Sequence, residues 1–322
     1  MTAVFLDYST MGDGLDLTPL TDLLPDLQIF DATSDDEVAG RIRDAEFVFV
    51  NKIRLDDALF EQAPKLRFIG LTATGTDNID TASAERHSVA VANIRAYCTQ
   101  SVTEHVFGAL LMLTHNLRKY SAAVQRGAWQ RASDFCMLDF PVRELSLMTM
   151  GIVGLGELGN SVARTARHFG MDVVVSARPG EDTVPDGRVA CDELLERAGV
   201  ISLHCPLNEH TAGLFGAREF QKMKSSAILI NTARGALVDT AALAAALRSG
   251  EIAAAAIDVL PKEPPVDGDP LLDYEGDNLI VTPHIAWSTD RARQEAINEL
   301  LSLIHISEPT RHRGPSRMPS SA

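Results

Sequence analysis

The fold of this chain is decided by the stretch Thr149-Met150-Gly151-Ile152-Val153-Gly154-Leu155-Gly156-Glu157-Leu158-Gly159. Its apolar residues up to Val153 predict a buried parallel strand, and the apolar spacing from Asn160 to Phe169 predicts a helix. Three glycines in the pattern G-x-G-x-x-G join them. The first makes a tight turn, the second lets backbone approach a pyrophosphate, and the third lets helix pack on strand. The sequence therefore predicts a dinucleotide site here, rather than a turn that merely needs glycine.

Composition limits the classes of protein that this chain can be. Its 322 residues are 45% hydrophobic, which is enough for two domains with cores of their own. The formal net charge of −15 argues against a nucleic-acid partner and gives no reason to expect membrane binding. With neither a signal peptide nor a transmembrane run in sight, we expect a cytoplasmic protein. The four cysteines have no metal-ligand spacing, so we expect reduced thiols and no metal site.

The end of the chain has a different character. The stretch from Leu301 to Arg311 resembles the translation of a sequencing adapter, and the residues after it have neither a helical nor a strand period. We therefore leave residues 301–322 out of the fold prediction and expect them to be a non-native tail. The native protein is then expected to end in a different helix, and His305 and His312 are not candidate ligands.

The first hundred residues alternate apolar runs with helical patterns. Strands are expected at residues 3–6, 27–30, 47–50, 66–71 and 89–92, and helices at 35–44 and 55–62. Such alternation is typical of a parallel sheet covered by helices. We predict a substrate domain made of residues 1–98 and 291–300, since a helix beginning at Arg291 should return to it.

The rest of the chain predicts a second α/β domain, residues 99–290. One long helix, residues 99–127, leads into it. After the glycine motif, strands are expected at residues 172–175, 200–203, 227–230, 253–259 and 279–282, with an alanine-rich helix at 236–247. Six strands with intervening helices predict a doubly wound nucleotide-binding sheet.

Three polar stretches each follow an apolar strand of this second domain: residues 231–235, 258–265 and 282–287. Ligands of parallel sheets bind at the carboxyl ends of strands. Arg234 can hold a carboxylate by a bidentate pair, and His284 can exchange a proton near neutral pH. A carboxylate such as Glu263 can orient a histidine and favour its charged form. Each residue alone is more often structural, but beside a dinucleotide they predict hydride transfer coupled to proton transfer.

These motifs bring the chain close to a known family. The segments 154–159, 231–235, 258–265 and 283–284 resemble the D-isomer-specific 2-hydroxyacid dehydrogenase family, over residues 1–300. Segments 5–7, 51–52, 73–80, 134–136 and 284–287 resemble its glycerate dehydrogenase (hydroxypyruvate reductase) branch. The resemblance implies two Rossmann-like domains, one flavodoxin-like and one doubly wound, with a cleft between them. It further implies reduction of a 2-oxoacid such as hydroxypyruvate or glyoxylate with NAD(H) or NADP(H).

The resemblance also implies roles for residues. Arg234 binds the substrate carboxylate and carbonyl, His284 is the acid and base, and Glu263 orients and charges His284. The implied substrate contacts also include Asn51 and the backbone of Ala73, Thr74 and Gly75. The implied dinucleotide contacts are Gly154, Gly156, Glu157, Leu158, Gly159, Ser176, Arg178, Cys205, Pro206, Thr232, Ala233, Asp258 and His284. Family members are usually dimers through the nucleotide domain, so a homodimer is expected, with the 99–127 helix as its arm.

One position departs from the pattern of NAD-preferring members. They carry an acidic residue for the ribose 2′-hydroxyl after the second strand, whereas this chain has Ser176-Ala177-Arg178-Pro179-Gly180. Arg178 therefore predicts use of NADP(H), because a guanidinium pairs with a 2′-phosphate. The alternatives are that Arg178 stacks on adenine or points to solvent.

Other readings stay open. A D-lactate-type dehydrogenase shares the same motifs. A phosphoglycerate dehydrogenase usually adds a regulatory domain, and a formate dehydrogenase typically has glutamine in the role of Glu263. From a different class, a dinucleotide-sensing scaffold similar to transcriptional corepressors would bind the dinucleotide without turnover.

Overall fold

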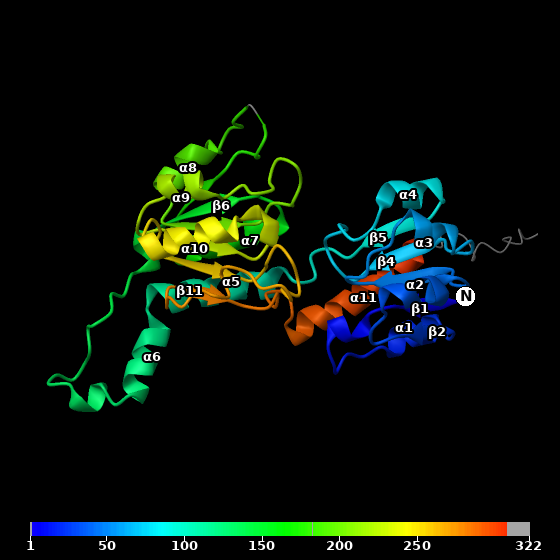
Figure 1. Ribbon diagram of the computed structural model, residues 1–322, viewed down its shortest axis with the longest axis horizontal. Coiled ribbons are helices and arrows are strands. Elements are labelled where there is room, and N and C mark those ends of the chain that lie inside the picture. Colours follow the sequence, from blue (N-terminus) through cyan, green and yellow to red (C-terminus); the bar gives the residue numbers. More distant parts are fainter. Residues whose placement is uncertain (1, 182, 308–322) are drawn as a thin grey trace, which may run out of the picture. The chain divides into compact units, whose positions relative to one another are not determined.

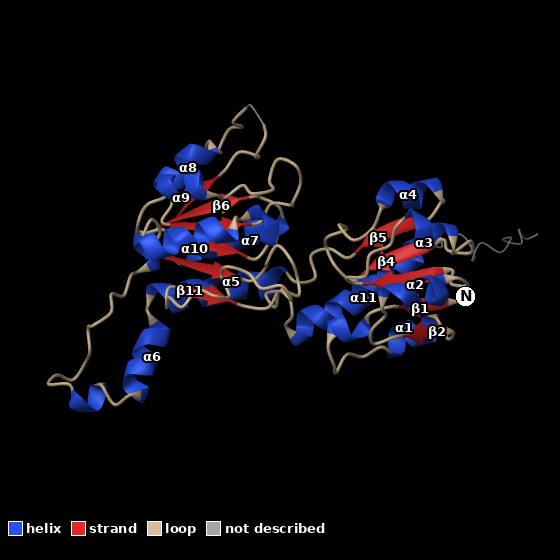
Figure 2. Ribbon diagram, in the orientation of Figure 1, coloured by secondary structure: helices blue, strands red, loops and turns tan. Residues whose placement is uncertain are grey.

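The computed structural model describes residues 2–181 and 183–307. The chain divides into two compact units. The first unit contains Met1–Cys98 and the chain from Ser288 onward, and the second unit contains Thr99–Trp287. Each unit is a parallel sheet with helices on its faces (Figures 1 and 2). No helix among the described residues is both long enough and apolar enough to cross a membrane.

The first unit has five parallel strands in the order β2-β1-β3-β4-β5. They are β1 Ala3–Phe5, β2 Leu27–Ile29, β3 Phe47–Val50, β4 Phe68–Leu71 and β5 Ala90–Asn93. This order is that of a flavodoxin-like sheet, so the predicted α/β class is confirmed. Its connections contain η1 Tyr8–Met11, α1 Thr18–Leu23, α2 Asp35–Ile42, α3 Asp57–Glu61 and α4 Thr81–Arg86. Ser34 and Glu37 begin α2, because the Glu37 carboxylate accepts the Ser34 N–H at 3.0 Å and the Ser34 hydroxyl at 2.8 Å.

The last helix, α11 Asp290–Ser307, packs against β4, β5 and α1 of the first unit. Gly70 of β4 makes room for it, since a Cβ there would lie 2.7 Å from Leu300. The helix was expected to contribute only up to Leu300, and this is corrected. Ile297, Leu300 and Ile304 keep the spacing of one helix face, and Ile304 is 2% exposed, so packing extends into the segment that resembles an adapter. Residues 308–322 lie outside the described residues.

The second unit has six parallel strands in the order β11-β10-β9-β8-β6-β7. They are β6 Thr149–Val153, β7 Asp172–Val175, β8 Val200–Leu203, β9 Ile228–Asn231, β10 Ala254–Ile257 and β11 Leu279–Val281. Val189 adds a single parallel bridge to Ser176 at the β7 edge. Since β7 lies on one side of β6 and β8 on the other, the strand order reverses between β6 and β8. Ligands of doubly wound sheets bind at this crevice, and the predicted sheet is confirmed.

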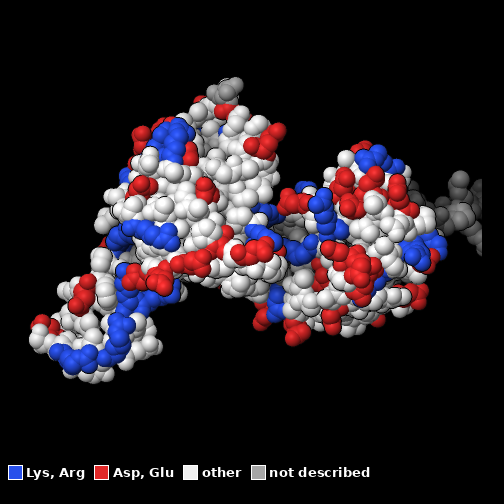
Figure 3. All heavy atoms as spheres, viewed as in Figure 1, with Lys and Arg blue, Asp and Glu red and all other residues white. Residues whose placement is uncertain are grey.

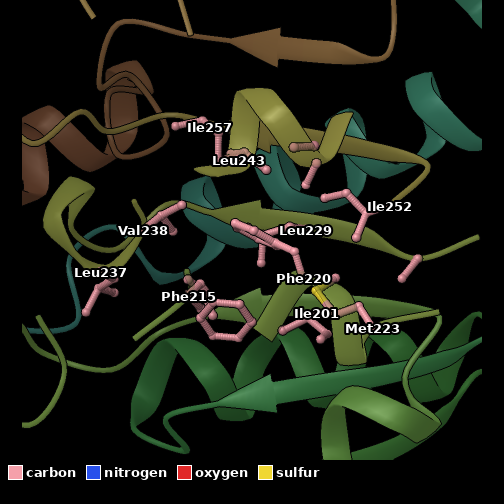
Figure 4. Packing of buried hydrophobic residues seen from close by; sticks show 14 of the residues in the cluster. Ile201, Phe215, Phe220, Met223, Leu229, Leu237, Val238, Leu243, Ile252 and Ile257 are labelled. Carbon is pink, nitrogen blue, oxygen red and sulfur yellow. The ribbon is translucent and has the colours of Figure 1, made fainter. Parts of the chain in front are cut away.

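The core of the second unit fixes the strand ends that carry the site. The helices are α7 Glu157–His168, α8 Cys191–Arg197, α9 Ala217–Lys222 and α10 Thr240–Ser249, with short turns η3 Leu145–Leu147 and η4 Gly235–Leu237. Figure 4 shows Ile201 of β8 and Leu229 of β9 packed with Phe220 of α9 and Leu243 of α10. All four are fully buried. Each such side chain contributes on the order of 1.5–3 kcal/mol, which holds the sheet rigid beneath the loops.

The long helix predicted for residues 99–127 is wrong, because the structure has two helices. They are α5 Thr99–Thr114 and α6 Leu117–Gln125. Asn116 separates them with a left-handed φ of 50°, a conformation that asparagine tolerates better than most residues. Its side-chain amide donates to the Pro141 carbonyl at 2.6 Å, which fixes the bend. After the bend α6 leaves the body of the second unit, followed by η2 Trp129–Arg131 (Figure 1). We call residues 117–143 the arm.

Candidate active site

The glycine motif forms the turn between β6 and α7. Gly154 has a φ of 96°, and a Cβ there would lie 2.5 Å from the backbone nitrogen of Cys205. A Cβ at Gly159 would lie 2.0 Å from the Gly154 carbonyl oxygen. At Gly156, in contrast, nothing lies within 4 Å of a Cβ. Two glycines thus permit close packing and the middle one borders open space, which fits a turn built for a dinucleotide diphosphate.

The first turn of α7 lies beside this open space. Its leading N–H groups have no partner within the helix, and such groups attract phosphate oxygens. Glu157 brings a carboxylate to the same turn, but its Oε1 accepts the Thr99 hydroxyl at 2.6 Å. The Glu157 side chain is therefore tied to α5, and the backbone N–H groups of Glu157 and Leu158 are the groups of this turn that suit an anion.

The end of β7 carries the two residues expected near the adenosine. Ser176 is buried, and its hydroxyl donates to the Ala177 carbonyl at 2.6 Å. The Arg178 side chain is 79% exposed, and its guanidinium lies 3.3 Å from a Glu181 carboxylate oxygen. Of the two, only Arg178 presents a charged group to solvent at this strand end.

The end of β8 carries a partly buried histidine and a buried thiol. Nε2 of His204 lies 2.9 Å from the Ser202 hydroxyl, and burial lowers the pKa of His204 to about 4. Burial also raises the pKa of the Cys205 thiol to about 11, so this cysteine is a neutral packing residue. Pro206 is exposed after it, and its carbonyl accepts the Thr211 hydroxyl at 2.8 Å.

The end of β9 shapes the loop that carries Arg234. Asn231 is fully buried, and its amide nitrogen donates to the Arg234 carbonyl at 2.9 Å while its Oδ1 accepts the Ala233 N–H at 3.0 Å. The Arg234 guanidinium donates to the Ala233 carbonyl at 2.8 Å. Sequence reasoning gave Asn231 no role, although a buried asparagine at a strand end is a typical signal of a fixed loop.

Glu263 and His284 are brought into direct contact. Nδ1 of His284 lies 2.6 Å from Oε2 of Glu263, and Oε1 of Glu263 accepts the Leu260 N–H at 2.9 Å. An ionised carboxylate only accepts hydrogen bonds, so this contact places a proton on Nδ1 and leaves Nε2 for exchange. The two side chains are 27% and 33% exposed, so the pair is sheltered and still reachable by a small molecule.

Asp258 holds the loop that presents His284. Its carboxylate is buried and accepts the Ile285 and Ala286 N–H groups, each at 2.9 Å, and the Thr282 hydroxyl at 2.6 Å. Its carbonyl accepts the His284 N–H at 2.7 Å. His284 has a φ of 56°, which is strained for a residue other than glycine, and these bonds keep it there. Asp258 therefore acts on the histidine through the backbone.

Two further residues support this loop and were not predicted. Nε2 of His105, on α5, lies 3.2 Å from the Thr282 hydroxyl, and the Trp287 indole donates to the His284 carbonyl at 3.0 Å. His105 is distant in sequence and carries no motif, so only the fold reveals it. Within residues 2–181 and 183–307, no group of three or more His, Cys, Asp or Glu side chains is arranged to hold a metal ion.

The substrate residues expected in the first unit lie at one edge of its sheet. Asp7, after β1, accepts the N–H groups of Asn51 at 2.9 Å and Lys52 at 2.7 Å, and burial raises the pKa of Asp7. The Asn51 side chain is buried and donates to the Thr10 hydroxyl at 2.9 Å. Asp7 thus fixes the turn in which Asn51 stands.

The segment Ala73–Gly75 follows the neighbouring strand, β4. Asn93 donates to the Thr74 carbonyl at 2.6 Å and ties this turn to the end of β5. Because β3 and β4 are paired in parallel, Asn51 and this turn occupy the same carboxyl edge of the first unit.

Comparison with known proteins agrees with this geometry. Residues 107–286 match the model of the D-isomer specific 2-hydroxyacid dehydrogenase family, NAD binding domain. A glycerate dehydrogenase of Methylorubrum extorquens is 42% identical over 267 residues, 83% of each chain. A hydroxypyruvate reductase of Blautia hydrogenotrophica is 36% identical, over 93% of this chain and 96% of the relative.

Solved structures show the same fold. A D-lactate dehydrogenase from Aquifex aeolicus, complexed with NAD and lactic acid, superposes with a TM-score of 0.79 at 28% identity over 94% of both chains. An acyclic imino acid reductase in complex with NADPH and D-Arg gives a TM-score of 0.81 at 26% identity, over 95% of this chain and 96% of that chain. The chain therefore belongs to the D-isomer specific 2-hydroxyacid dehydrogenase family and is an oxidoreductase that uses NAD(H) or NADP(H).

Proposed function

We propose that this chain reduces a small 2-oxoacid, hydroxypyruvate or glyoxylate, to its D-2-hydroxyacid, and that Arg234, Glu263 and His284 carry the reaction. The observation that carries the proposal is the 2.6 Å contact between His284 Nδ1 and Glu263 Oε2 at the carboxyl edge of the nucleotide sheet. The similarity to a glycerate dehydrogenase and a hydroxypyruvate reductase supports this choice of substrates.

His284 supplies the proton in this scheme. The Glu263 carboxylate holds the proton on Nδ1 and stabilises the doubly protonated ring, so Nε2 can donate to the carbonyl oxygen of the oxoacid. In the reverse direction the same nitrogen takes the hydroxyl proton. Arg234 binds the substrate carboxylate, because a guanidinium matches a carboxylate with two parallel hydrogen bonds. Asn51 and the turn of Ala73, Thr74 and Gly75 are proposed to complete substrate binding from the first unit.

The residues at the carboxyl edge of the second sheet suit a dinucleotide. The open space at Gly156 and the N–H groups of Glu157 and Leu158 suit the diphosphate, and Ser176, Arg178, Cys205 and Pro206 follow the strands on the adenosine side. Thr232, Ala233, Asp258 and His284 follow the strands on the nicotinamide side. A bound nicotinamide supplies or accepts the hydride, and the chain's own residues orient the oxoacid and move the proton.

We also propose that NADP(H) is the preferred cofactor. Arg178 stands at the end of β7, and the Arg178 side chain is 79% exposed. An acidic residue at this strand end would repel a 2′-phosphate, whereas an arginine attracts it. A phosphate dianion is a stronger partner for this guanidinium than the single Glu181 carboxylate oxygen at 3.3 Å.

The arm supports a homodimer. Its tip exposes large apolar side chains, with Trp129 53%, Phe135 88% and Leu138 86% exposed. Residues 117–131 contain four basic and no acidic residues, while the whole chain carries −15 (Figure 3). A basic, apolar arm on an acidic protein suits a second copy of the same chain. Replacing Phe135 and Leu138 with aspartate should then give monomers in light scattering, and an unchanged mass would refute this interface.

We propose that the enzyme is cytoplasmic, because a reducing environment keeps thiols from forming disulfides. Cys98, Cys136, Cys191 and Cys205 are all unbridged in the structure.

The decisive test is an absorbance assay at the nicotinamide band, with hydroxypyruvate, glyoxylate and pyruvate, each against NADH and NADPH. Oxidation with hydroxypyruvate or glyoxylate is expected, and a preference for pyruvate would instead indicate a D-lactate-type enzyme. If no oxoacid is reduced by a folded protein that binds the dinucleotide, the proposed reaction is wrong. Changing His284 to Ala should lower kcat by roughly 10²- to 10⁴-fold, because proton transfer is lost.

A further inference from the structure

Five neighbouring strands of the second unit end in register. The pairing aligns Val153 with Leu203, Leu203 with Asn231, Asn231 with Ile257 and Ile257 with Val281. These are the last residues of β6, β8, β9, β10 and β11. The next residue of each strand therefore forms a row across the carboxyl edge of the sheet. We call Gly154, His204, Thr232, Asp258 and Thr282 the edge row.

Asp258 and Thr282, at one end of the edge row, already have a structural role. Asp258 and Thr282 bind each other at 2.6 Å and hold the His284 loop. At the other end, Gly154 belongs to the glycine turn. The two members between them, His204 and Thr232, directly follow the paired strands β8 and β9. They stand between the diphosphate turn and the proton-transfer pair.

These two middle members share an unusual property. Among the residues that the structure describes, Nδ1 of His204 and Oγ1 of Thr232 are the buried side-chain polar atoms without a hydrogen-bond partner. Parts of His204 reach the surface, but its Nδ1 does not. An unpaired buried polar group costs about 1–3 kcal/mol, so two adjacent ones at a strand edge call for a ligand.

We infer that Nδ1 of His204 and Oγ1 of Thr232 together bind a hydroxyl-bearing part of the dinucleotide, its ribose, between the diphosphate and the nicotinamide. His204 is then a positioning residue that neither motif nor spacing indicates. A sugar hydroxyl suits both atoms, since it donates to one and accepts from the other. This inference rests on the proposed dinucleotide-dependent function, but it concerns binding and needs no turnover.

His204 acts here as a neutral group. Its other nitrogen, Nε2, pairs with the Ser202 hydroxyl at 2.9 Å, which fixes the ring on the strand. Burial keeps the pKa of His204 near 4, so the ring stays uncharged at neutral pH. Each nitrogen therefore has a separate task, and the two tasks can be separated by substitution.

Two variants isolate the nitrogens. The side-chain nitrogen of asparagine stands near the position of Nδ1, and that of glutamine near the position of Nε2. His204→Asn keeps the proposed dinucleotide contact and loses the Ser202 bond. His204→Gln keeps the Ser202 bond and loses the dinucleotide contact. NADH and NADPH dissociation constants, measured by fluorescence titration without oxoacid, are compared with melting temperatures of the same proteins.

We expect His204→Gln to weaken dinucleotide binding about tenfold, the effect of one lost hydrogen bond, and His204→Asn to bind within about threefold of the wild type. Binding that is unchanged in His204→Gln, or weaker in His204→Asn than in His204→Gln, overturns the inference. In that case an internal water satisfies Nδ1.

Thr232→Val provides an independent check with nearly the same side-chain shape. If Oγ1 binds the dinucleotide, the valine variant binds it severalfold more weakly. If Oγ1 has no ligand, removal of an unpaired buried hydroxyl raises the melting temperature and leaves binding unchanged. Oxoacid turnover is measured separately on each protein. A chain that binds the dinucleotide through His204 and reduces no oxoacid would refute the proposed function and leave this inference standing.

Discussion

Gly235 stands so close to Leu260 that a Cβ added to the glycine would lie 1.9 Å from the Leu260 carbonyl carbon. This contact joins the two loops that carry the chemistry, because Arg234 precedes the glycine and Glu263 follows the leucine by three residues. Because Gly235 has no side chain, the two loops can pack backbone to backbone. The distance between Arg234 and Glu263 therefore depends on a glycine at this position.

Changing Gly235 to Ala should accordingly damage the site from a distance. The methyl group meets backbone atoms that have no free rotamer, so one loop must shift. We expect kcat/KM to fall at least tenfold, and the melting temperature to fall by several degrees for a loss of about 1–3 kcal/mol. Kinetics and differential scanning calorimetry measure both. Wild-type activity in the alanine variant would mean that the Leu260 loop yields without cost.

The glycine motif allows a matched pair of substitutions. At Gly156 a Cβ meets nothing within 4 Å, whereas at Gly159 it would lie 2.0 Å from the Gly154 carbonyl oxygen. Gly156→Ala should therefore keep its melting temperature and bind NADH more weakly, because the methyl group enters the space of the diphosphate. Gly159→Ala should lose stability before any ligand is added, because α7 can no longer pack on β6. If both variants bind the dinucleotide like the wild type, the turn is not its site.

Asp258 offers a test of positioning against direct catalysis. The two carboxylate oxygens of Asp258 accept two backbone N–H groups and a hydroxyl. In Asp258→Asn an NH2 group replaces one of these oxygens, and this group cannot accept a hydrogen bond from the donors that face it. The left-handed His284 then loses its support. We expect a large fall in kcat and a lower melting temperature. A second change, His284→Gly in the Asp258→Asn background, should restore the melting temperature in part, since glycine adopts this φ freely. No such restoration would show that strain at His284 is not what Asp258 supports.

Patterns of the sequence were enough to predict the sheets. The strands β7 and β8 begin and end at the predicted residues, since buried parallel strands are short apolar runs with polar ends. The helix predicted at 236–247 instead begins at Thr240, because Asp239 accepts the Ala242 N–H and caps it there. Periodicity alone could not locate that cap, nor the break at Asn116, where one residue leaves the helical conformation within an otherwise continuous apolar pattern.

Site residues that belong to a sequence motif could be predicted from the sequence. Site residues whose role depends on contacts made in the folded chain could not. Glu263 and His284 lie within recognisable proline-containing stretches, and the structure places them in contact. The role of His105 emerges only from the fold, because it contacts Thr282 on a distant loop. Asn231 and His204 form their hydrogen bonds within their own segments, and their roles depend on which of their atoms are buried and paired. The sequence shows that these residues are polar, but it does not show which atoms lack a partner.

Arg178 gives a prediction on cofactor preference. Arg178→Ser removes the cation at the end of β7, and we expect kcat/KM with NADPH to fall about tenfold or more while that with NADH changes little. Glu181→Gln is the matched control, because it removes the carboxylate 3.3 Å from the guanidinium and should favour NADPH slightly. Equal efficiencies with both cofactors in the wild type, unchanged by either substitution, would mean that Arg178 points to solvent.

The partly buried His204 makes stability depend on pH in a defined window. Its pKa is about 4 in the folded chain and near its usual 6.5 when unfolded, so between these values the unfolded state binds a proton that the folded state does not. The free energy of unfolding should therefore fall as the pH drops from about 6.5 to about 4, by at most ~3 kcal/mol from this residue, and no further below that. Denaturant titrations of the wild type and His204→Asn, each from pH 7 to pH 4, isolate the effect, because asparagine does not titrate and all other groups are shared. The stability difference between the two proteins should change across the window in the direction that favours His204→Asn at low pH. A constant difference would mean that the imidazole is protonated in the folded chain as readily as in water, and its neutral role at the sheet edge would then be lost.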